Sequence, residues 1–507
     1  MLATVHSVTI WGIDGYPVRV ELDISRGLPG ISIVGLPDQA VKESRDRLKP
    51  AIKNSGLSFP GGKITVNLSP ADLKKEGPYF DLPIAIGLLA AGGEIPLSVL
   101  ERFAIAGELA LDGSVRPVRG ALSLSLSAKN AGFEGMILPE ENAKEAAVAG
   151  DISVYGVKNL TECCDFLSGK SDKDPVQVDW DALLLEQNKY DLDFRDVKGQ
   201  FQAKRALEIA VSGGHNILMI GPPGSGKSML AKSVPTVLPS LSLKEALSIT
   251  RIHSAAGMSE YSALMSRRPF RQPHHTISDI ALIGGGSAPA PGEISLAHGG
   301  VLFLDELPEF RRDVLESLRQ PLEAGTVNIS RARGKMEFPA RFLLVTAMNP
   351  CPCGYYGDSS HRCTCTVNQI LRYRKKISGP LLDRIDIHIE VPALEVGMLM
   401  GEEGGESSQE VRKRVEAARH IQKDRLARET IYFNGHMNVS QTKRFCVLGK
   451  EERTFIEGVL ETMQLSARAF DKVRKVARTI ADLDGADRIG IAHLSEAVQY
   501  RAFDRNI

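Results

Sequence analysis

The sequence predicts a mixed α/β protein with a helical C-terminal region, and the patterning of apolar residues supports this fold class. Short apolar or alternating runs, typical of strands, recur between helical patterns over the first 170 residues and again between residues 191 and 395. After residue 410 the pattern is helical throughout. Charged or glycine-rich stretches without apolar periodicity separate these regions. We therefore expect an α/β domain (1–170), a linker (171–190), a second α/β domain (191–395) and a helical domain (396–507).

Individual elements can be placed within two of these regions. In the first region, strand patterns fall at residues 18–24, 31–34, 64–67 and 103–109, and helical spacing falls at residues 39–55, 82–91 and 122–132. In the last region, helices are expected at residues 411–430, 450–463, 466–483 and 493–503.

The composition is that of an ordinary globular protein. Hydrophobic residues make up 43% and charged residues 24% of the chain, which excludes a disordered or fibrous protein. Lys plus Arg and Asp plus Glu both number 62, so a polyanionic partner would need a local basic surface. No apolar run approaches the ~18 residues of a membrane-spanning helix, and the first residues lack a signal-peptide pattern. These absences predict a cytoplasmic protein without a membrane partner.

The strongest signal is a glycine-rich loop between a buried strand pattern and a helix. It matches G-x-x-x-x-G-K-S in full and consists of Gly221, Pro222, Pro223, Gly224, Ser225, Gly226, Lys227 and Ser228. Such a loop directs backbone N–H groups at a phosphate near a helix N-terminus. We expect Lys227 to reach the β- and γ-phosphates of ATP, and Ser228 to ligate Mg²⁺.

Two further strands end in polar residues that would complete a nucleotide site. An apolar strand at residues 301–304 leads into Asp305 and Glu306, and a strand at residues 342–348 ends at Asn349. Ligands of open α/β sheets bind beyond the carboxyl ends of the strands. Asp305 is expected to hold Mg²⁺ through water, Glu306 to polarise the attacking water, and Asn349 to bond the γ-phosphate and that water.

Two arginines are candidates for contacts to the transferred phosphoryl group. Arg384 follows Leu-Leu-Asp, and a guanidinium there neutralises developing charge, often from a neighbouring subunit. Arg468, at the start of a C-terminal helix, would contact the γ-phosphate of its own subunit; Arg474 and Arg478 compete for that role. The alternatives are a surface salt bridge for Arg384 and an ordinary helix position for Arg468.

With these residues in place, the chain resembles the AAA+ ATPases, and among them the ComM/YifB type of magnesium chelatase-like protein. Gly-Gly-His-Asn at residues 213–216, Arg-Gln-Pro-His-His-Thr at 271–276 and three glycines at 284–286 also carry the resemblance. It covers nearly the whole chain. It implies a helical lid after the ATPase core and a homo-oligomer, typically a hexameric ring. It also implies a DNA motor (a helicase or translocase) for branch migration in natural transformation (competence), with other recombination proteins as further partners.

The resemblance also implies two elements that point into the pore of the ring. These are an insertion at residues 271–297 and a hairpin at residues 325–340. The hairpin carries Arg331, Arg333 and Lys335, which we expect to contact DNA phosphates without sequence preference. A solvated hairpin without such contacts is the alternative.

The first domain resembles the Lon-type protease domain, of the ribosomal protein S5 domain 2 fold. Tyr79 stands where that domain has its nucleophilic serine, and Leu122 stands in the place of the catalytic lysine. Since a Ser–Lys pair needs a hydroxyl nucleophile and an amine base, we expect no peptidase activity but a role in binding or assembly. The polar residues Asp81 and Lys63 have no assigned role.

Four cysteines lie between positions 351 and 365: Cys351, Cys353, Cys363 and Cys365. Four thiolates suffice for a closed tetrahedral zinc site. The spacing is C-x-C rather than the usual C-x₂-C, so reduced thiols and a redox pair stay open as alternatives. His361 is a spare candidate ligand.

Three functions compete. The ATPase core permits a DNA motor and also a chelatase-type ATPase that remodels a protein partner or drives metal insertion into a tetrapyrrole. The protease-like first domain favours the motor, because chelatase ATPase subunits generally begin at the ATPase core. A module that binds ATP without hydrolysing it is opposed by Glu306 and Arg384.

Overall fold

The computed structural model describes residues 2–75, 77–186, 190–258, 263–286, 290–331, 334–358, 361–393, 405–429, 431–463 and 466–501. Its contacts divide the chain into two compact units. The first comprises the residues up to Glu186 together with Ser242–Ser266, and the second comprises Gln187–Leu241 and Arg267–Ile507. A segment that lies within the expected second domain therefore belongs to the first unit.

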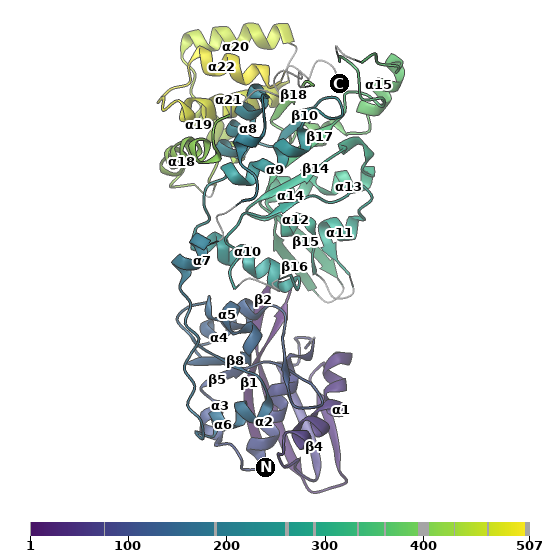
Figure 1. The fold of residues 1–507 in the computed structure, drawn as a ribbon, viewed down its shortest axis with the longest axis vertical. Coiled ribbons are helices and arrows are strands. Elements are labelled where there is room, and N and C mark those ends of the chain that lie inside the picture. The colour runs from purple at the N-terminus through teal and green to yellow at the C-terminus, as the bar shows by residue number, and fades with distance from the viewer. Residues whose placement is uncertain are drawn as a thin grey trace. The chain divides into compact units, whose positions relative to one another are not determined.

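A mixed seven-stranded sheet forms the centre of the first unit (Figure 1). Its strand order is β3-β4-β2-β1-β5-β8-β9, with antiparallel pairs on both sides of β2 and parallel pairs elsewhere. The strands are β1 (Leu2–Trp11), β2 (Asp14–Ser25), β3 (Gly30–Val34), β4 (Lys63–Ser69), β5 (Phe103–Ile105), β8 (Gly135–Pro139) and β9 (Ser153–Val157), and a short hairpin joins β6 (Glu108–Leu109) to β7 (Val115–Arg116). The expected strands are confirmed within a few residues, except that residues 103–109 form two strands, and strands β1, β7, β8 and β9 were not expected.

The helices of this unit are α1 (Gln39–Asn54), α2 (Asp81–Ala91), α3 (Leu97–Leu100), α4 (Ala121–Asn130), α5 (Glu140–Ala147), α6 (Leu160–Leu167), α7 (Trp180–Glu186) and α10 (Leu243–Ala255). All residues of α2 are buried, which agrees with a sequence that is apolar almost throughout. The helix expected at residues 82–91 is thus a core helix.

Helix α10 reaches the first unit from a distant part of the sequence. It begins with a capping box between Ser242 and Glu245. Its Arg251 donates to the carbonyl of Ile13 at 3.3 Å and pairs with Asp14, and Ser254 donates to Glu145. These polar contacts and its buried apolar face attach α10 to the β1–β2 turn and to α5.

A five-stranded parallel sheet forms the core of the second unit (Figure 1). Its order is β11-β14-β17-β10-β18, with β10 (Ile217–Ile220), β11 (Phe270–Arg271), β14 (Val301–Leu304), β17 (Leu343–Met348) and β18 (Ile387–Glu390). Two hairpins extend from it, β12 (Gly284–Gly285) with β13 (Ala290–Pro291), and β15 (Thr326–Arg331) with β16 (Gly334–Pro339). The core helices are α8 (Phe201–Gly213), α9 (Lys227–Val237), α11 (Asp279–Ile283), α12 (Glu293–Leu296), α13 (Arg312–Ser317), α14 (Arg319–Ala324), α15 (Val367–Arg374) and α16 (Gly379–Leu382).

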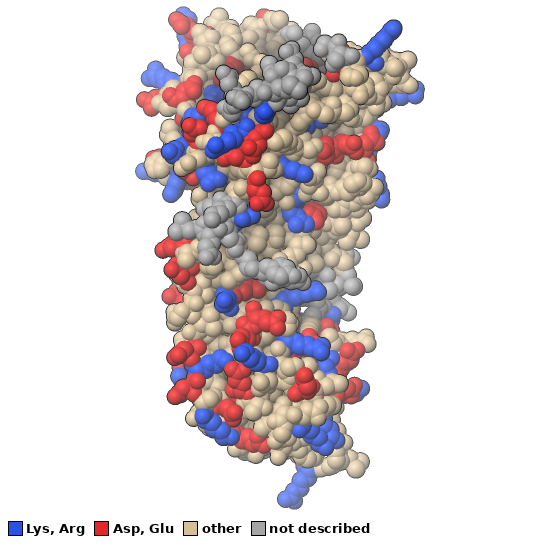
Figure 2. All heavy atoms as spheres, viewed as in Figure 1, with Lys and Arg blue, Asp and Glu red and all other residues tan. Residues whose placement is uncertain are grey.

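The C-terminal region is helical, as the sequence predicts. It contains α18 (Ser408–Arg425), α19 (Val439–Phe445), α20 (Lys450–Met463), α21 (Ala467–Leu483) and α22 (Ile491–Gln499). Within the described part of the chain, every helix is too short or too polar to span a membrane. Basic and acidic side chains are interspersed on the face shown in Figure 2, so electrostatic attraction of a polyanion would depend on local groups.

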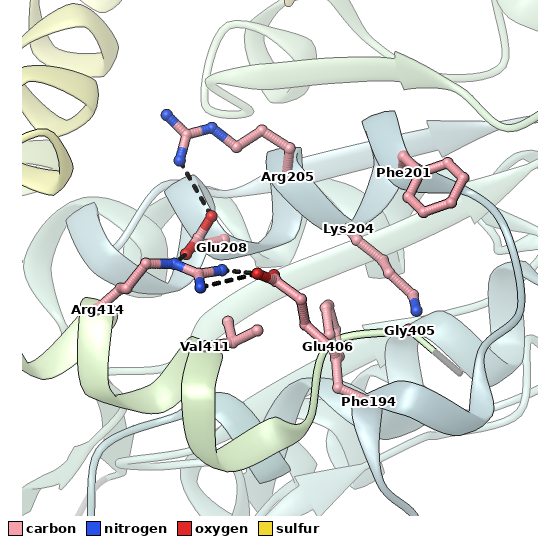
Figure 3. A pocket seen from close by; sticks show the side chains of 9 residues that line it. All are labelled: Phe194, Phe201, Lys204, Arg205, Glu208, Gly405, Glu406, Val411 and Arg414. Carbon is pink, nitrogen blue, oxygen red and sulfur yellow. Dashed lines mark hydrogen bonds and ion pairs between the residues drawn. The ribbon is translucent and has the colours of Figure 1, made fainter. Parts of the chain in front are cut away.

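An ion-pair network fastens the helical region to the core. Buried Glu208 of α8 accepts from Arg414 Nε at 2.5 Å and from Arg205 Nη1 at 3.1 Å. Arg414 also pairs with Glu406, and Arg205 pairs with Glu496 of α22 at 3.0 Å. Figure 3 shows Arg205, Glu208, Glu406 and Arg414 of this network along a cavity of about 310 Å³. Lys204 also lines that cavity, and its buried Nζ has no hydrogen-bond partner among the described residues.

We expect Glu208→Ala to lower the free energy of unfolding by about 2 kcal/mol, because both arginines lose a shared buried carboxylate but keep partial solvent access. Denaturant unfolding would measure this, with Glu457→Ala, an exposed helix position, as the matched control. Equal stability of the two variants would contradict a fastening role for the network.

Candidate nucleotide site

The sheet order brings three predicted strand ends to one edge. β17 lies between β14 and β10, with Leu304 opposite Thr346 and Ile220 opposite Met348. Because all three strands are parallel, the residues that follow them emerge on the same side. The glycine-rich loop, the Asp305–Glu306 pair and Asn349 are therefore neighbours.

The glycine-rich loop joins β10 to α9 with the backbone that its sequence predicts. Gly226 precedes the helix with φ of 89°, a backbone conformation that residues other than glycine rarely adopt. Gly221 packs so closely on β18 that an added Cβ would lie 2.1 Å from the carbonyl oxygen of Val391. Gln200 braces the loop by donating to the carbonyls of Ser225 at 3.1 Å and Pro392 at 2.8 Å. No sequence pattern pointed to this role of Gln200.

The ammonium group of Lys227 is held by neutral groups of its own loop. Its Nζ donates to the carbonyl oxygens of Gly221 and Pro222, both at 2.7 Å, and lies 3.5 Å from Asn349 Oδ1. Burial lowers the pKa of Lys227 to about 8, although nearby Asp305 opposes the shift. A phosphate at this position would supply the negative charge that the ammonium lacks.

The predicted magnesium ligands are in direct contact. Ser228 Oγ donates to Asp305 Oδ2 at 2.7 Å. A hydroxyl and a carboxylate are oxygen ligands of the kind that Mg²⁺ prefers, so the pair fits a cation bound beside a nucleotide phosphate.

Glu306 lies beside a histidine that sequence reasoning did not single out. Its backbone has φ of 51°, and its carboxylate is 3.5 Å from His275 Nδ1. The ring of His275 packs on His274, with centroids 4.1 Å apart, and meets Phe310 edge-on at 6.4 Å. The sequence feature that could have pointed to His275 is the segment at 271–276, which carries the family resemblance but gave its histidines no role.

The Gly-Gly-His-Asn segment explains how the core and the arginine-bearing elements are joined. Asn216 Nδ2 donates to the carbonyl of Arg384 at 2.9 Å, and Asn216 Oδ1 accepts from the backbone N–H of Leu344 in β17 at 3.0 Å. His215 bridges Asp386 Oδ2 at 3.0 Å and Thr479 Oγ1 at 2.8 Å.

Asp386, at one end of this bridge, is held as a carboxylate. Burial works against its ionised form, but the hydrogen bond with His215 and the charge of Lys472 outweigh it and keep the pKa of Asp386 far below its usual range. The segment that carries Arg384 and the helix that carries Arg468 are thus tied together.

The two arginines predicted to contact the phosphoryl group have acidic partners at neighbouring positions. Arg384 pairs with Glu323, and Arg468 Nη1 lies 3.1 Å from Oδ2 of Asp383, the residue that precedes Arg384. Among the described residues, neither forms a hydrogen bond or ion pair with Lys227, Ser228, Asp305 or Asn349. The role of Arg468 within its own subunit stays a prediction.

The competing arginines on α21 have structural partners. Arg474 donates to the carbonyl of Cys446 at 2.7 Å, and Arg478 Nε donates to Asp482 at 3.0 Å. Both are buried within the helical region. These contacts leave Arg468, whose side chain is 78% exposed, as the arginine of this helix that can meet a ligand.

The hairpin at residues 325–340 is present, and one of its faces is buried. Val327, Ile329, Met336 and Phe338 are buried, whereas Lys335 is exposed. The side chain of Arg331 and all of Arg333 lie outside the described residues. Of the three basic residues expected to contact DNA, Lys335 is the one whose exposure the structure describes.

The four cysteines converge on one point. The Sγ atoms of Cys351, Cys353, Cys363 and Cys365 all lie within 4.8 Å of one another. The ring of His361 instead stacks on Tyr355, with centroids 4.8 Å apart, and its side chain is 65% exposed. The chemistry of this donor set fits zinc without a fifth ligand.

The protease-like positions of the first unit carry no catalytic pair. Leu122 is fully buried, and Tyr79 packs partly buried against the core. Asp81, which had no assigned role, accepts from Arg47 Nε at 2.8 Å and also from Ser44. It anchors α1 to the start of α2.

The fold and the site define a P-loop protein of the AAA+ type. The family described as magnesium chelatase, subunit ChlI, matches residues 193–399. A second family, described as subunit ChlI of Mg-chelatase, matches residues 20–142, and a third, described as the C-terminal part of subunit ChlI, matches residues 405–501. The chain therefore belongs to the magnesium chelatase ChlI-like family of ATPases.

Several relatives extend over the whole chain. The protein YifB of Salmonella typhimurium is 46% identical over 506 residues, covering 99% of this chain and 98% of its own. The competence protein ComM of Haemophilus influenzae is 44% identical over 507 residues, with the same coverage. A Lon protease of Geobacter metallireducens is 28% identical over 140 residues, 26% of this chain and 17% of its own.

Proposed function

We propose that this protein is an ATP-driven, ring-forming DNA motor that promotes branch migration of incoming DNA during natural transformation. The observation that carries the proposal is the meeting of Lys227, Ser228, Asp305 and Asn349 at one sheet edge, in a chain similar over its full length to a competence protein. Lys227 would bind the β- and γ-phosphates, and Ser228 and Asp305 would hold Mg²⁺. Glu306 would orient the attacking water, and Asn349 would sense the γ-phosphate.

The placement of the arginines supports assembly into a homo-oligomer, for which we propose a hexamer. Arg384 engages Glu323 rather than the phosphate site of its own chain. A guanidinium supplied by the next subunit would complete each site, as arginines commonly do in phosphoryl transfer. Arg468, beside Asp383, would be drawn to the same region when nucleotide binds.

We propose that the β15–β16 hairpin contacts DNA through its basic residues. Arg331, Arg333 and Lys335 would neutralise phosphates without reading bases, which suits a motor that must move along any sequence. A chelatase-type ATPase that acts on a protein partner is the second candidate, favoured by the family match over residues 193–399. Other recombination proteins are the further partners we propose.

The test is ATP hydrolysis with and without DNA. We expect forked or branched DNA to stimulate hydrolysis, and the double variant Arg331→Ala/Arg333→Ala to lose most of the stimulation while its DNA-free rate stays unchanged. Lys443→Ala, an exposed lysine of α19, is the matched control. Branch-migration assays with ATP and a non-hydrolysable analogue would follow. Stimulation by a protein fraction but by no form of DNA would favour the chelatase-type alternative.

A second variant addresses the orientation of Glu306. His275→Ala removes the group within 3.5 Å of its carboxylate, and we expect kcat to fall by about tenfold with little change in KM, since only alignment of the water is affected. His275→Asn, which keeps a hydrogen-bonding group, should restore part of the rate. An unchanged kcat in His275→Ala would show that the histidine does not position Glu306.

A further inference from the structure

In the four-cysteine cluster, the separations among three of the sulfurs are close to those of a tetrahedral metal site. The Sγ atom of Cys351 lies 3.3 Å from that of Cys353 and 3.7 Å from that of Cys363, and Cys353 and Cys363 are 3.6 Å apart. Zn–S bonds of about 2.3 Å at tetrahedral angles place sulfurs about 3.8 Å apart. A disulfide would bring two of them to about 2.05 Å.

The backbone around the sulfurs is organised as in a metal knuckle. The N–H of Cys353 donates to Cys365 Sγ at 3.4 Å, and the N–H of Cys365 donates to Cys363 Sγ at 3.4 Å. Such N–H donors support thiolate charge next to a cation. Cys365 directly precedes Thr366, which caps α15 through a capping box with Gln369, so the second C-x-C pair is fixed by a helix.

The segment at residues 351–365 that carries the four cysteines (the cysteine loop) also contacts the nucleotide site from two sides. Cys351 follows Asn349 by two residues, and Arg374 Nε of α15 contacts the intervening carbonyl of Pro350 at 3.4 Å. Gly354 lies directly against the glycine-rich loop, since a Cβ added there would stand 2.8 Å from Cδ of Pro223. The loop therefore packs on the phosphate-binding backbone and continues the strand that ends at Asn349.

We propose that Cys351, Cys353, Cys363 and Cys365 bind one Zn²⁺, and that the loaded loop clamps Pro223 and Asn349, so that metal loading sets the affinity of the site for nucleotide. The nucleotide half of this inference rests on the proposed function. Without the metal, four sulfurs within 4.8 Å have no common partner, and the loop loses the link that holds its two C-x-C pairs together.

Measuring the metal content tests the proposed zinc binding independently of any enzymatic activity. We expect one zinc per chain, measured by mass spectrometry of the purified protein and by a chromogenic chelator after mercurial release. Cys353→Ser and Cys365→Ser should contain less than about a fifth of that amount, whereas Cys164→Ala, a buried cysteine of the first unit, should keep it. Zinc-free wild-type protein with four titratable thiols, or with a disulfide, would overturn the proposal.

A pair of glycine variants tests the clamp while all four cysteines stay in place. Gly354→Ala and Gly357→Ala both add a methyl group at positive φ (91° and 82°), but only the first meets Pro223; the second has no atom within 4 Å. We expect both variants to retain zinc and only Gly354→Ala to bind a fluorescent ATP analogue about tenfold more weakly. Equal affinity of the two variants would overturn the clamp.

The failure of the clamp and the failure of the proposed function give different results. Lys227→Ala should lose nucleotide and keep its zinc. Zinc-loaded wild-type protein that binds no nucleotide would refute the ATPase assignment. Wild-type protein that binds nucleotide equally well before and after zinc removal would refute the coupling alone.

Discussion

Lys227→Ala should reduce ATP hydrolysis by at least about 10²-fold, with or without DNA, because the variant lacks the ammonium group that would bind the β- and γ-phosphates. The ammonium group is already at the mouth of the loop, 2.7 Å from two of its carbonyls. The variant removes the positive charge that a bound nucleotide needs. In the nucleotide-free loop, only neutral carbonyl groups stabilise that charge.

Steady-state phosphate release measures this effect, and binding of a fluorescent ATP analogue separates lost affinity from lost turnover. Lys232→Ala, an exposed lysine on the same helix α9, is the matched control and should hydrolyse ATP like the wild type. Comparable melting temperatures would show that both proteins are folded. A fully active Lys227→Ala would refute the site assignment altogether.

Arg384→Ala should lower kcat by about 10³-fold while leaving nucleotide affinity nearly unchanged, because the guanidinium would act on charge that develops in the transition state. Arg384→Lys should restore little, since an ammonium lacks the planar fork of donors. Its present partners, Glu323 and the carbonyl of Pro380, lie at the protein surface, so the substitution leaves no buried group unpaired.

Mixing two inactive variants tests whether Arg384 serves a neighbouring subunit. Lys227→Ala supplies Arg384 but has no working phosphate loop, and Arg384→Ala has the opposite defect. In an equal mixture, about a quarter of the interfaces would combine an intact loop with an intact arginine and regain activity. A mixture of Lys227→Ala with Glu306→Gln, whose defects lie in the same half-site, is the control and should stay inactive. Absence of regained activity in both mixtures would place Arg384 in its own subunit's site.

The sequence predicted best which candidate-site residues lie together where they follow short strands of one sheet. The glycine-rich loop, the Asp305–Glu306 pair and Asn349 each follow a short buried strand, and parallel strand order alone brings them together. Contacts between distant segments carried no such signal. Asn216 binds the carbonyl of Arg384, 168 residues away, and the sequence marks it only as part of the segment at 213–216 that carries the family resemblance, without a role for its side chain.

Strand β1 and helix α10 were missed for different reasons. The alternation of buried residues in β1 is incomplete, with three consecutive buried positions that include the polar Ser7 and Thr9, so a period-2 apolar pattern does not mark this strand. Helix α10 has an ordinary capping box and apolar face. The local sequence does not specify whether such a helix packs on its own domain or on another, because its apolar face can pack on any apolar surface of suitable shape.

The placement of α10 has a consequence for dissecting the protein. The chain passes between the two units three times, after Glu186, after Leu241 and after Ser266. Proteolytic nicking near residue 187 would leave Ser242–Ser266 covalently joined to the second unit but packed on the first, so the two fragments would copurify through this non-covalent docking. A fragment that starts at residue 190 would keep α10 without its docking surface, and its exposed apolar face would promote aggregation. Truncations that replace Ser242–Ser266 with a short polar loop are the ones that should yield a well-behaved isolated core.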